Sequence, residues 1–213
     1  MEILKVVLFI LGAYLIGSIS TAVWIGKIFF DTDIREEGSG NAGFTNAVRV
    51  LGWKAGIPVF VIDVLKGFFA VSLVKIFHVY SPSTSAFVNY QLILGAAAVL
   101  GHIFPLYAGF RGGKGVATLL GIAFGIAPLP TLVCMGVFLI VFTSTRYVSL
   151  ASMTAGLAFP VTVIFIFKTS VISLIIFSVL VSILLIITHQ KNIERLLRRE
   201  ESRANFRRKR RHH

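Results

Sequence analysis

The stretch VATLLGIAFGIAPLPTLVCMGVFLIVFTS, residues 116–144, decides how often this chain crosses a membrane. It is long for one crossing and short for two, since each crossing needs about 20 mostly apolar residues. Pro128 and Pro130 stand in its middle, and proline breaks a continuous helix because it lacks an amide hydrogen. The stretch therefore predicts a hairpin of two short helices.

Five further apolar runs each predict one membrane helix, which makes seven in all. They cover residues 3–29, 57–77, 87–104, 147–167 and 171–187. The 213-residue chain is 56% hydrophobic and 14% charged, with a mean hydropathy of +0.86, outside the range of soluble domains. Backbone amides in lipid must be hydrogen-bonded within their own segment. We therefore expect an all-α integral membrane protein.

The basic residues sort the connecting loops, because Lys and Arg accumulate on the cytoplasmic side. In the arrangement with seven helices, one side receives the C-terminal tail together with Lys27, Arg35, Arg49, Lys54, Arg111, Lys114 and Arg146. The other side receives Lys5, Lys75 and Lys168. This predicts an outside N-terminus and a cytoplasmic C-terminus. Six helices would place Arg111 and Lys114 outside, so we favour seven.

The net charge of +12 arises largely in the tail HQKNIERLLRREESRANFRRKRRHH, residues 189–213. A basic segment next to the membrane would lie on anionic lipid, at about 1 kcal/mol per basic residue. This explains the charge without a nucleic-acid partner. The first apolar run lacks a strong basic start and is too long for a signal peptide, so we expect it to be retained. We predict a membrane domain over residues 1–197 and a disordered basic cytoplasmic tail over 198–213, whose final two His are given no function.

The loop GSGNAGFTNAVRVLG, residues 38–52, combines small and polar residues. Small residues let a backbone approach a ligand closely. Hydrogen bonds and a positive charge come from Ser39, Asn41, Thr45, Asn46 and Arg49. The loop has what an anion site needs.

A second loop, GHIFPLYAGFRGGKGVAT at residues 101–118, places Gly112, Gly113 and Gly115 around Lys114 just before a helix. Backbone amides and the positive end of the helix dipole would then meet a lysine, which suits a phosphate. Close helix packing is the alternative role for these glycines. The spacing departs from a Walker A loop, which disfavours a nucleotide hydrolase.

Two more polar groups follow, Arg146–Tyr147–Ser149–Ser152 and His189–Asn192, and all four groups share one membrane face in this arrangement. That convergence is the main functional signal. Each of these residues also has a simpler possible role. Arg146 could only set the topology, and Ser149 and Ser152 could hydrogen-bond the backbone of their own helix. His102 could be a packed residue at the membrane interface rather than a base. Asp63 and Lys66, three apart on one helix face, predict a structural ion pair. No residue spacing supports a metal site, and Cys134 alone forms no disulfide framework.

Four motifs together closely resemble the bacterial acyl-phosphate:glycerol-3-phosphate acyltransferases, membrane enzymes that start phosphatidic acid synthesis. They are GSGNAGFTNAVRVLG, GHIFPLYAGFRGGKGVAT, RYVSLAS and HQKNIERLL, in the family's order, and the resemblance reaches Leu197. Phe44 stands where the family usually has a small residue, a minor departure that would reshape the loop.

The resemblance implies a fold of seven membrane helices in a bacterial inner membrane, with the active site facing the cytoplasm. It implies transfer of a fatty acyl group from acyl phosphate to the 1-hydroxyl of glycerol 3-phosphate, giving 1-acyl-glycerol 3-phosphate and phosphate. Neither acyl coenzyme A nor acyl carrier protein is the direct donor, and no cofactor is implied. The lipid bilayer and the soluble enzyme that forms acyl phosphate are the candidate partners.

Carried over position by position, the motifs imply functional roles for Ser39, Asn41, Thr45, Arg49, Gly113, Lys114, Ser152, His189 and Asn192. We expect Lys114, His189, Ser152 and Asn192 to be catalytic. The others are expected to bind substrate and phosphate, together with Gly40, Asn46, His102, Gly112, Gly115 and Ser149.

An acyl phosphate is a mixed anhydride with a good leaving group, so positioning and charge stabilisation can do most of the work. We hypothesise that Lys114 with the Gly112 and Gly113 amides holds one phosphate, and that Arg49 with Ser39 and Asn41 holds the other. The hydroxyl proton goes to His189 or to a substrate phosphate oxygen. We favour the substrate because the sequence shows no His–carboxylate pair.

The main alternative is a membrane transporter of a phosphate ester or small anion, since basic pockets between helices also bind such solutes. Transporters often have two similar halves with helices broken near the midplane. This sequence shows no internal repeat, and its motifs share one face, which favours interfacial chemistry. A lipid-binding scaffold ranks last because it leaves the glycine-rich loops without a purpose.

Overall fold

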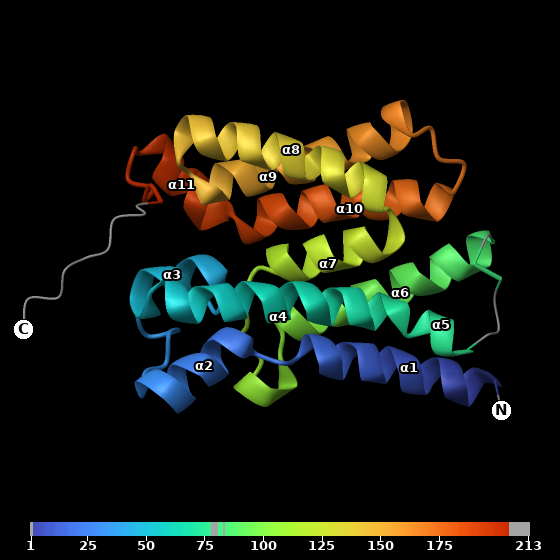
Figure 1. Ribbon diagram of the computed structural model, residues 1–213, viewed down its shortest axis with the longest axis horizontal. Coiled ribbons are helices and arrows are strands. Elements are labelled where there is room, and N and C mark those ends of the chain that lie inside the picture. The colour runs from blue at the N-terminus through green and yellow to red at the C-terminus, as the bar shows by residue number, and fades with distance from the viewer. Residues whose placement is uncertain (1, 78–80, 83, 205–213) are drawn as a thin grey trace, which may run out of the picture.

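The protein is a bundle of helices that run roughly along one axis, as Figure 1 shows for a computed structural model. The structure describes residues 2–77, 81–82 and 84–204, and the regular elements over these ranges are all helical. They are α1 Glu2–Gly17, α2 Thr21–Phe30, α3 Phe44–Leu51, α4 Trp53–Ser72, α5 Val74–Phe77, α6 Ser85–Ile103, η1 Leu106–Ala108, α7 Val116–Ile126, α8 Pro128–Thr145, α9 Val148–Val161, the π-helical η2 Thr162–Ile166, α10 Ile172–Thr188 and α11 Gln190–Leu197. The expected all-α membrane class is confirmed.

Several helices are long and apolar enough to cross a bilayer. Four of those described qualify alone, Trp53–Ile76, Ser85–Ala108, Pro128–Thr145 and Val148–Ile166. Two bent pairs, α1 with α2 and α10 with α11, raise the number to six if each pair is one span. The short apolar helix α7 comes in addition. The chain is therefore a multi-pass membrane protein.

The first predicted span, residues 3–29, is not one straight helix. It bends by 43° between α1 and α2, where residues 18–20 leave the helix. The carbonyl of Ile19 in this break accepts a hydrogen bond from Lys66 Nζ at 2.7 Å, and Thr21 Oγ1 donates to Asp63 Oδ1 at 3.1 Å. Lys66 and Asp63 form the expected ion pair at 2.8 Å, almost fully buried in α4. The break thus supplies polar partners to a buried pair of charges.

The hairpin predicted over residues 116–144 is present as two helices, α7 and α8, which meet at Ala127. Pro128 is the first residue of α8, where a helix needs no amide hydrogen. The two arms are unequal, with 11 residues in α7 and 18 in α8. At about 1.5 Å per residue α7 is roughly 17 Å long, well under the thickness of about 30 Å of a bilayer core.

Glycines bring the helices of the bundle into close contact. A Cβ on Gly121 of α7 would lie 1.9 Å from the Val64 carbonyl oxygen of α4, and one on Gly125 would lie 2.4 Å from Val71 Cγ2. Gly121 faces Val64 and Gly125 faces Val71, so residue numbers rise in the same direction along both helices, and α7 runs parallel to α4. This packing places the start of α7, and the loop before it, against the middle of the bundle.

We expect Gly121→Ala to destabilise the protein by about 1–3 kcal/mol, because the added methyl meets backbone that cannot move independently. Thermal unfolding in one detergent, compared with the unchanged chain, measures the effect. Gly136→Ala in α8 is the matched control, since nothing lies within 4 Å of a Cβ there. Equal midpoints for the two variants would show that α7 does not depend on close packing against α4.

Candidate functional site

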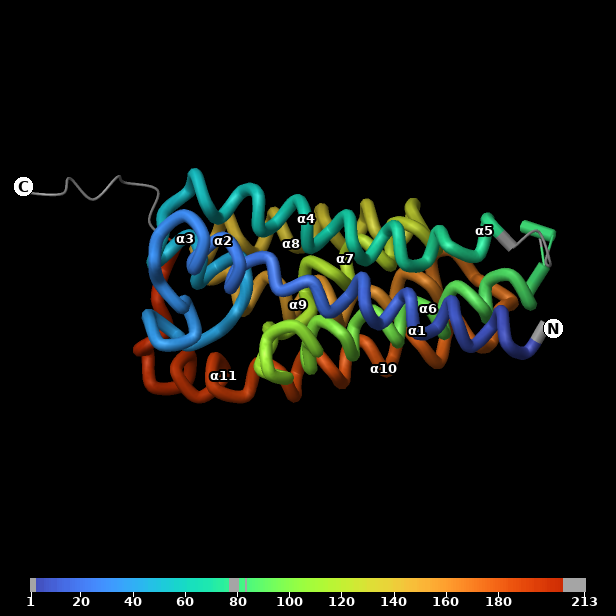
Figure 2. Tube along the Cα trace, turned by 90° about the horizontal axis from the view of Figure 1, so that it is seen from below, coloured from blue at the N-terminus to red at the C-terminus, as the bar shows by residue number. Residues whose placement is uncertain are grey.

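The polar groups of the sequence gather at one end of the bundle. In Figures 1 and 2, α3 and α11 lie at one end, and α5 and the N-terminus lie at the other. A cavity of about 650 Å³ opens there. Of the residues predicted for the site, its lining includes Ser39, Gly40, Asn41, Thr45, Asn46, Arg49, His102, Lys114, Gly115, Ser149, Ser152, His189 and Asn192. Gly112 and Gly113 are the two that do not line it.

The first loop is shaped by Asn46, which is buried at the start of α3. Its side-chain nitrogen donates to the carbonyl oxygens of Ile34 at 2.8 Å and Glu37 at 3.0 Å, and its oxygen accepts from the amide of Ser39 at 2.9 Å. Gly40 has φ +71°, a conformation that favours glycine. Asn46 therefore fixes the curve of the loop that places Ser39 and Gly40 at the cavity.

Arg35, in the segment just before this loop, connects that segment to the second loop, a role that the sequence did not reveal. Its guanidinium pairs with Asp33 at 2.6 Å and donates to the carbonyl oxygen of Ala108 in η1, also at 2.6 Å. The hydrogen bond from Arg35 holds the pKa of Asp33 well below its usual range. The segment before the first loop is thus fastened to the second loop beside the cavity.

The second loop does not have the geometry expected for its glycines, whose amides were predicted to hold a phosphate. The amides of Gly112 and Gly113 donate to the carbonyl oxygens of Ile103 at 3.1 Å and His102 at 3.2 Å, so they are already paired and do not hold a phosphate. A Cβ on Gly112 would lie 1.9 Å from the His102 oxygen. These two glycines serve close packing against the end of α6. Gly115, at φ +81°, precedes α7 and does line the cavity.

Lys114 projects from this loop into the cavity, and its Nζ donates to Oδ1 of Asn192 in α11. Burial lowers the pKa of Lys114 to about 8; Glu201 opposes that shift, and the charges of Arg195 and Arg49 add to it. The lysine is therefore largely charged at neutral pH but close to its titration point. A bound anion would favour the charged form.

His189 lies at the bend of 59° between α10 and α11 and is buried. Its Nδ1 is 2.8 Å from the carbonyl oxygen of Leu185, which can only accept, so Nδ1 carries the proton. Burial and the charge of Lys114 lower the pKa of His189 to about 4. The neutral imidazole therefore presents Nε2 as an acceptor. His102, by contrast, bonds Thr118 Oγ1 through Nδ1 at 3.1 Å within the bundle.

The remainder of the cavity is mostly apolar and reaches between α7, α8, α9 and α10. Side chains on its wall include Leu120, Phe138, Phe159, Phe177 and Val181. A cavity with cations, hydroxyls and amides at one end and hydrocarbon at the other suits an amphiphile with an anionic head. No group of three His, Cys, Asp or Glu side chains within the described ranges could hold a metal ion.

Residues of the tail also line the cavity, which the sequence reasoning missed. Glu201 accepts hydrogen bonds from Ser149 Oγ at 2.7 Å and Asn192 Nδ2 at 2.6 Å, and its other oxygen pairs with Arg195 Nε at 2.8 Å. The one available signal was a pair of carboxylates, Glu200 and Glu201, inside a basic run. The boundary at Leu197 stays a prediction, and residues 205–213 lie outside the described residues.

Comparison with known proteins identifies the family. The model of the family described as glycerol-3-phosphate acyltransferase matches residues 7–199. The chain belongs to the glycerol-3-phosphate acyltransferase family. It is 43% identical to an acyltransferase of this family from Chlorobium phaeobacteroides strain BS1, with 91% of this chain and 94% of the relative covered. It is also 43% identical to one from Chlorobaculum tepidum, over 94% and 97%.

Solved structures of the family show the same fold. The crystal structure of PlsY (YgiH), an integral membrane glycerol 3-phosphate acyltransferase, in its glycerol 3-phosphate form matches with a TM-score of 0.83 and 38% identity, over 94% of this chain and 96% of that chain. The lysophosphatidic acid form of PlsY matches with a TM-score of 0.80. The resemblance drawn from the four motifs is therefore confirmed, and the protein is a membrane-embedded acyltransferase of phospholipid synthesis.

Proposed function

We propose that this acyltransferase moves a fatty acyl group from acyl phosphate to the 1-hydroxyl of glycerol 3-phosphate. The observation that carries the proposal is one cavity that has Arg49 of α3 and Lys114 of the second loop on its wall, beside an apolar compartment. Two phosphate-bearing substrates need two cationic positions, and an acyl chain needs a hydrocarbon wall. The relative PlsY has been solved in glycerol 3-phosphate and lysophosphatidic acid forms, which supports the acceptor and the product.

The reaction needs no covalent intermediate on the protein. The 1-hydroxyl oxygen forms a bond to the acyl carbonyl carbon, the bond from that carbon to the phosphate oxygen breaks, and inorganic phosphate leaves with the bonding pair. Positioning the two substrates and stabilising the negative charge are then the main tasks of the site. We assign one phosphate to Lys114, and the other to Arg49 with Ser39 and Asn41. Asn46, Gly112 and Gly113 shape the loops.

The hydroxyl proton has two candidate acceptors. The Nδ1 contact of His189 to Leu185 leaves Nε2 as an unprotonated nitrogen on a residue of the cavity wall. A phosphate oxygen of the substrate, which the sequence favoured, is the other acceptor. The fixed tautomer of His189, which leaves Nε2 unprotonated, favours the histidine, while its lowered pKa makes it a weaker base than an ordinary imidazole.

The proposed topology keeps seven crossings, with α7 as a short one, an outside N-terminus and a cytoplasmic C-terminus. The packing directions support it. Tyr90, early in α6, donates to the carbonyl of Val6, early in α1, and Gly101, late in α6, packs on Tyr14, late in α1, so α1 and α6 run parallel. Six or seven crossings both make α1 parallel to α6 and α4 parallel to α7, and the turn at Ala127, after which α8 runs back along the bundle in Figure 1, favours seven. The site then faces the cytoplasm of a bacterial inner membrane, where a soluble enzyme that forms acyl phosphate could deliver the donor.

The testing experiment measures phosphate release from palmitoyl phosphate by the purified protein in lipid, with and without glycerol 3-phosphate. We expect release that depends on glycerol 3-phosphate, with palmitoyl coenzyme A inert as donor. Release from neither donor would overturn the enzyme assignment for this chain and would direct attention to flux assays of glycerol 3-phosphate in vesicles.

The affinity for a phosphate dianion should fall as the pH rises above about 8. Lys114, with its pKa lowered to about 8, is charged below that pH and neutral above it, while His189, with its pKa lowered to about 4, stays neutral. Glycerol 3-phosphate is already a dianion in this range. Since binding needs the charged lysine, the Kd should rise by up to tenfold per pH unit above pH 8.

Calorimetric titration with glycerol 3-phosphate between pH 7 and 9.5 checks this. Lys114→Arg is the matched control, because an arginine does not titrate in that range and should give a flat profile at whatever affinity it retains. The same steep profile in Lys114→Arg would assign the titration to another group.

A further inference from the structure

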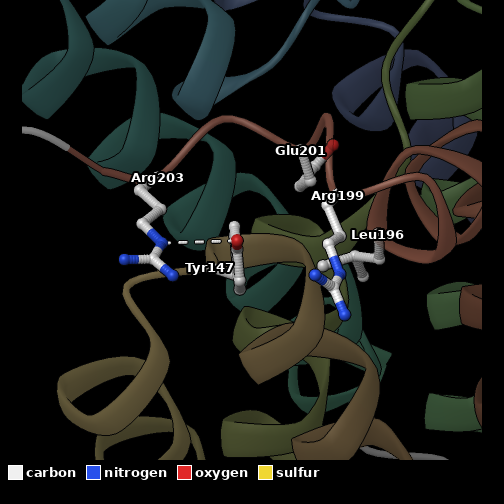
Figure 3. A pocket seen from close by; sticks show the side chains of 5 residues that line it. All are labelled: Tyr147, Leu196, Arg199, Glu201 and Arg203. Carbon is white, nitrogen blue, oxygen red and sulfur yellow. Dashed lines mark hydrogen bonds between the residues drawn. The ribbon is translucent and has the colours of Figure 1, made fainter.

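A short segment after α11, residues 200–204, folds back along the polar end of the cavity; we call it the strap. Its backbone is fastened at both ends, since the Glu200 amide donates to the Arg195 carbonyl at 2.7 Å and the Ala204 amide donates to the Arg146 carbonyl at 2.8 Å. Figure 3 shows Arg203 of the strap reaching the hydroxyl of Tyr147, at 3.3 Å. The strap therefore links α11 to the turn between α8 and α9.

The strap puts a carboxylate among the donors of the active site. The side chain of Glu201 is only 7% exposed, and its three partners are a hydroxyl, an amide and a guanidinium, from Ser149, Asn192 and Arg195. Lys114 bonds the same Asn192 and is attracted by the charge of Glu201. A hydroxyl, an amide and a guanidinium donate to this one anion, and a lysine ammonium attracts it from nearby; such a set of groups also binds a phosphate.

We infer that Glu201 occupies the position of a substrate phosphate, so that the strap competes with phosphate esters for the active site. The inference rests on the proposed function for its substrates. A carboxylate that stayed in place beside an arriving dianion would face a like charge in a buried site, which is strongly unfavourable. Binding therefore requires Glu201 to leave, and its donors then turn to the phosphate.

The position of the strap in the chain agrees with this role. The family model ends its match at residue 199, one residue before the strap begins. Ser149, Asn192 and Lys114, in contrast, all lie inside the matched range. The strap therefore lies just beyond the range that the family model matches, while the three residues that surround its carboxylate lie inside that range.

Competition has a measurable consequence. If the site is open only while the strap is released, the apparent affinity for a phosphate is the intrinsic affinity multiplied by the open fraction. Removing the charge of Glu201 raises that fraction, because a neutral side chain is held less strongly by Arg195 and Lys114.

The test uses the full chain with Glu201→Gln and, as matched control, Glu200→Gln, which removes the same charge from an exposed neighbouring side chain. The probe is inorganic phosphate, titrated by calorimetry, followed by KM and kcat with palmitoyl phosphate and glycerol 3-phosphate. We expect Glu201→Gln to bind phosphate at least fivefold more tightly and to lower KM for one substrate without lowering kcat. Glu200→Gln should change neither by more than twofold.

Weaker or unchanged phosphate binding in Glu201→Gln, or a lower kcat, would overturn the proposal and make Glu201 a positioning residue for Asn192. Arg203→Ala, which releases the strap from Tyr147 without touching the cavity donors, is the second variant if Glu201→Gln does not fold. It should tighten phosphate binding in the same direction, and no change would overturn the proposal. Because phosphate binding is measured without turnover, these outcomes hold even if palmitoyl phosphate is not a donor.

Discussion

Lys114→Ala should lower glycerol 3-phosphate-dependent phosphate release by about 10²- to 10³-fold, the range for loss of one preorganised charged donor in an active site. The lysine is the cation that the second loop brings into the cavity, and Asn192 holds its ammonium group in place. Its burial means that no water can substitute for the missing charge at low cost. Initial rates at saturating palmitoyl phosphate, over a range of glycerol 3-phosphate concentrations, measure the loss.

Two further variants serve as controls for the loss of activity in Lys114→Ala. Lys75→Ala removes a lysine from the exposed surface of α5, at the opposite end of the bundle, and should leave the rate within twofold. Lys114→Arg keeps the charge but not the shape and should recover part of the activity. A Lys114→Ala enzyme that retained more than a third of its rate would show that the phosphate assigned to Lys114 is held by another group.

The membrane fold could be predicted from the sequence because lipid imposes simple rules. Apolar length gave the helices, and Pro128 located the turn between α7 and α8. The bend at residues 18–20 could not be predicted, since its cause is a tertiary contact from Lys66, 47 residues further along the chain, to the Ile19 carbonyl. Apolar length alone does not distinguish a straight helix from a bent one.

The residues of the site were predictable to the extent that chemistry fixes their type. Thirteen of the predicted positions line one cavity, but the pairing of individual atoms depends on the fold. The backbone amides of Gly112 and Gly113 donate to carbonyls of α6 rather than to a ligand. The side-chain amide of Asn46 donates to the nearby Ile34 carbonyl, so it does not point to a ligand either. Glu201 was missed because a short charged tail carries no periodic signal, and its contacts run to Ser149 on another helix.

His189→Gln should lower kcat by about 10²- to 10⁴-fold, the range for loss of a general base, with little change in the Kd of either substrate. Glutamine has nearly the length of histidine, and its side-chain nitrogen can still donate to the Leu185 carbonyl, but it cannot accept a proton. Single-turnover rates and equilibrium binding of both substrates separate the chemical step from affinity. Gln190→Ala, an exposed neighbour on α11, is the control for local disturbance.

The dependence of kcat on pH distinguishes the two candidate bases, because they become protonated, and so inactive, at different pH values. His189, with its pKa lowered to about 4, is already the free base across pH 5–8, so kcat governed by it should be level over that range. A substrate phosphate loses its last proton near pH 6, so kcat governed by the substrate should fall below that pH in both the unmutated enzyme and His189→Gln. If His189→Gln keeps the full rate and loses activity below about pH 6, the substrate phosphate is the base. His189 would then serve only to hold the bend between α10 and α11.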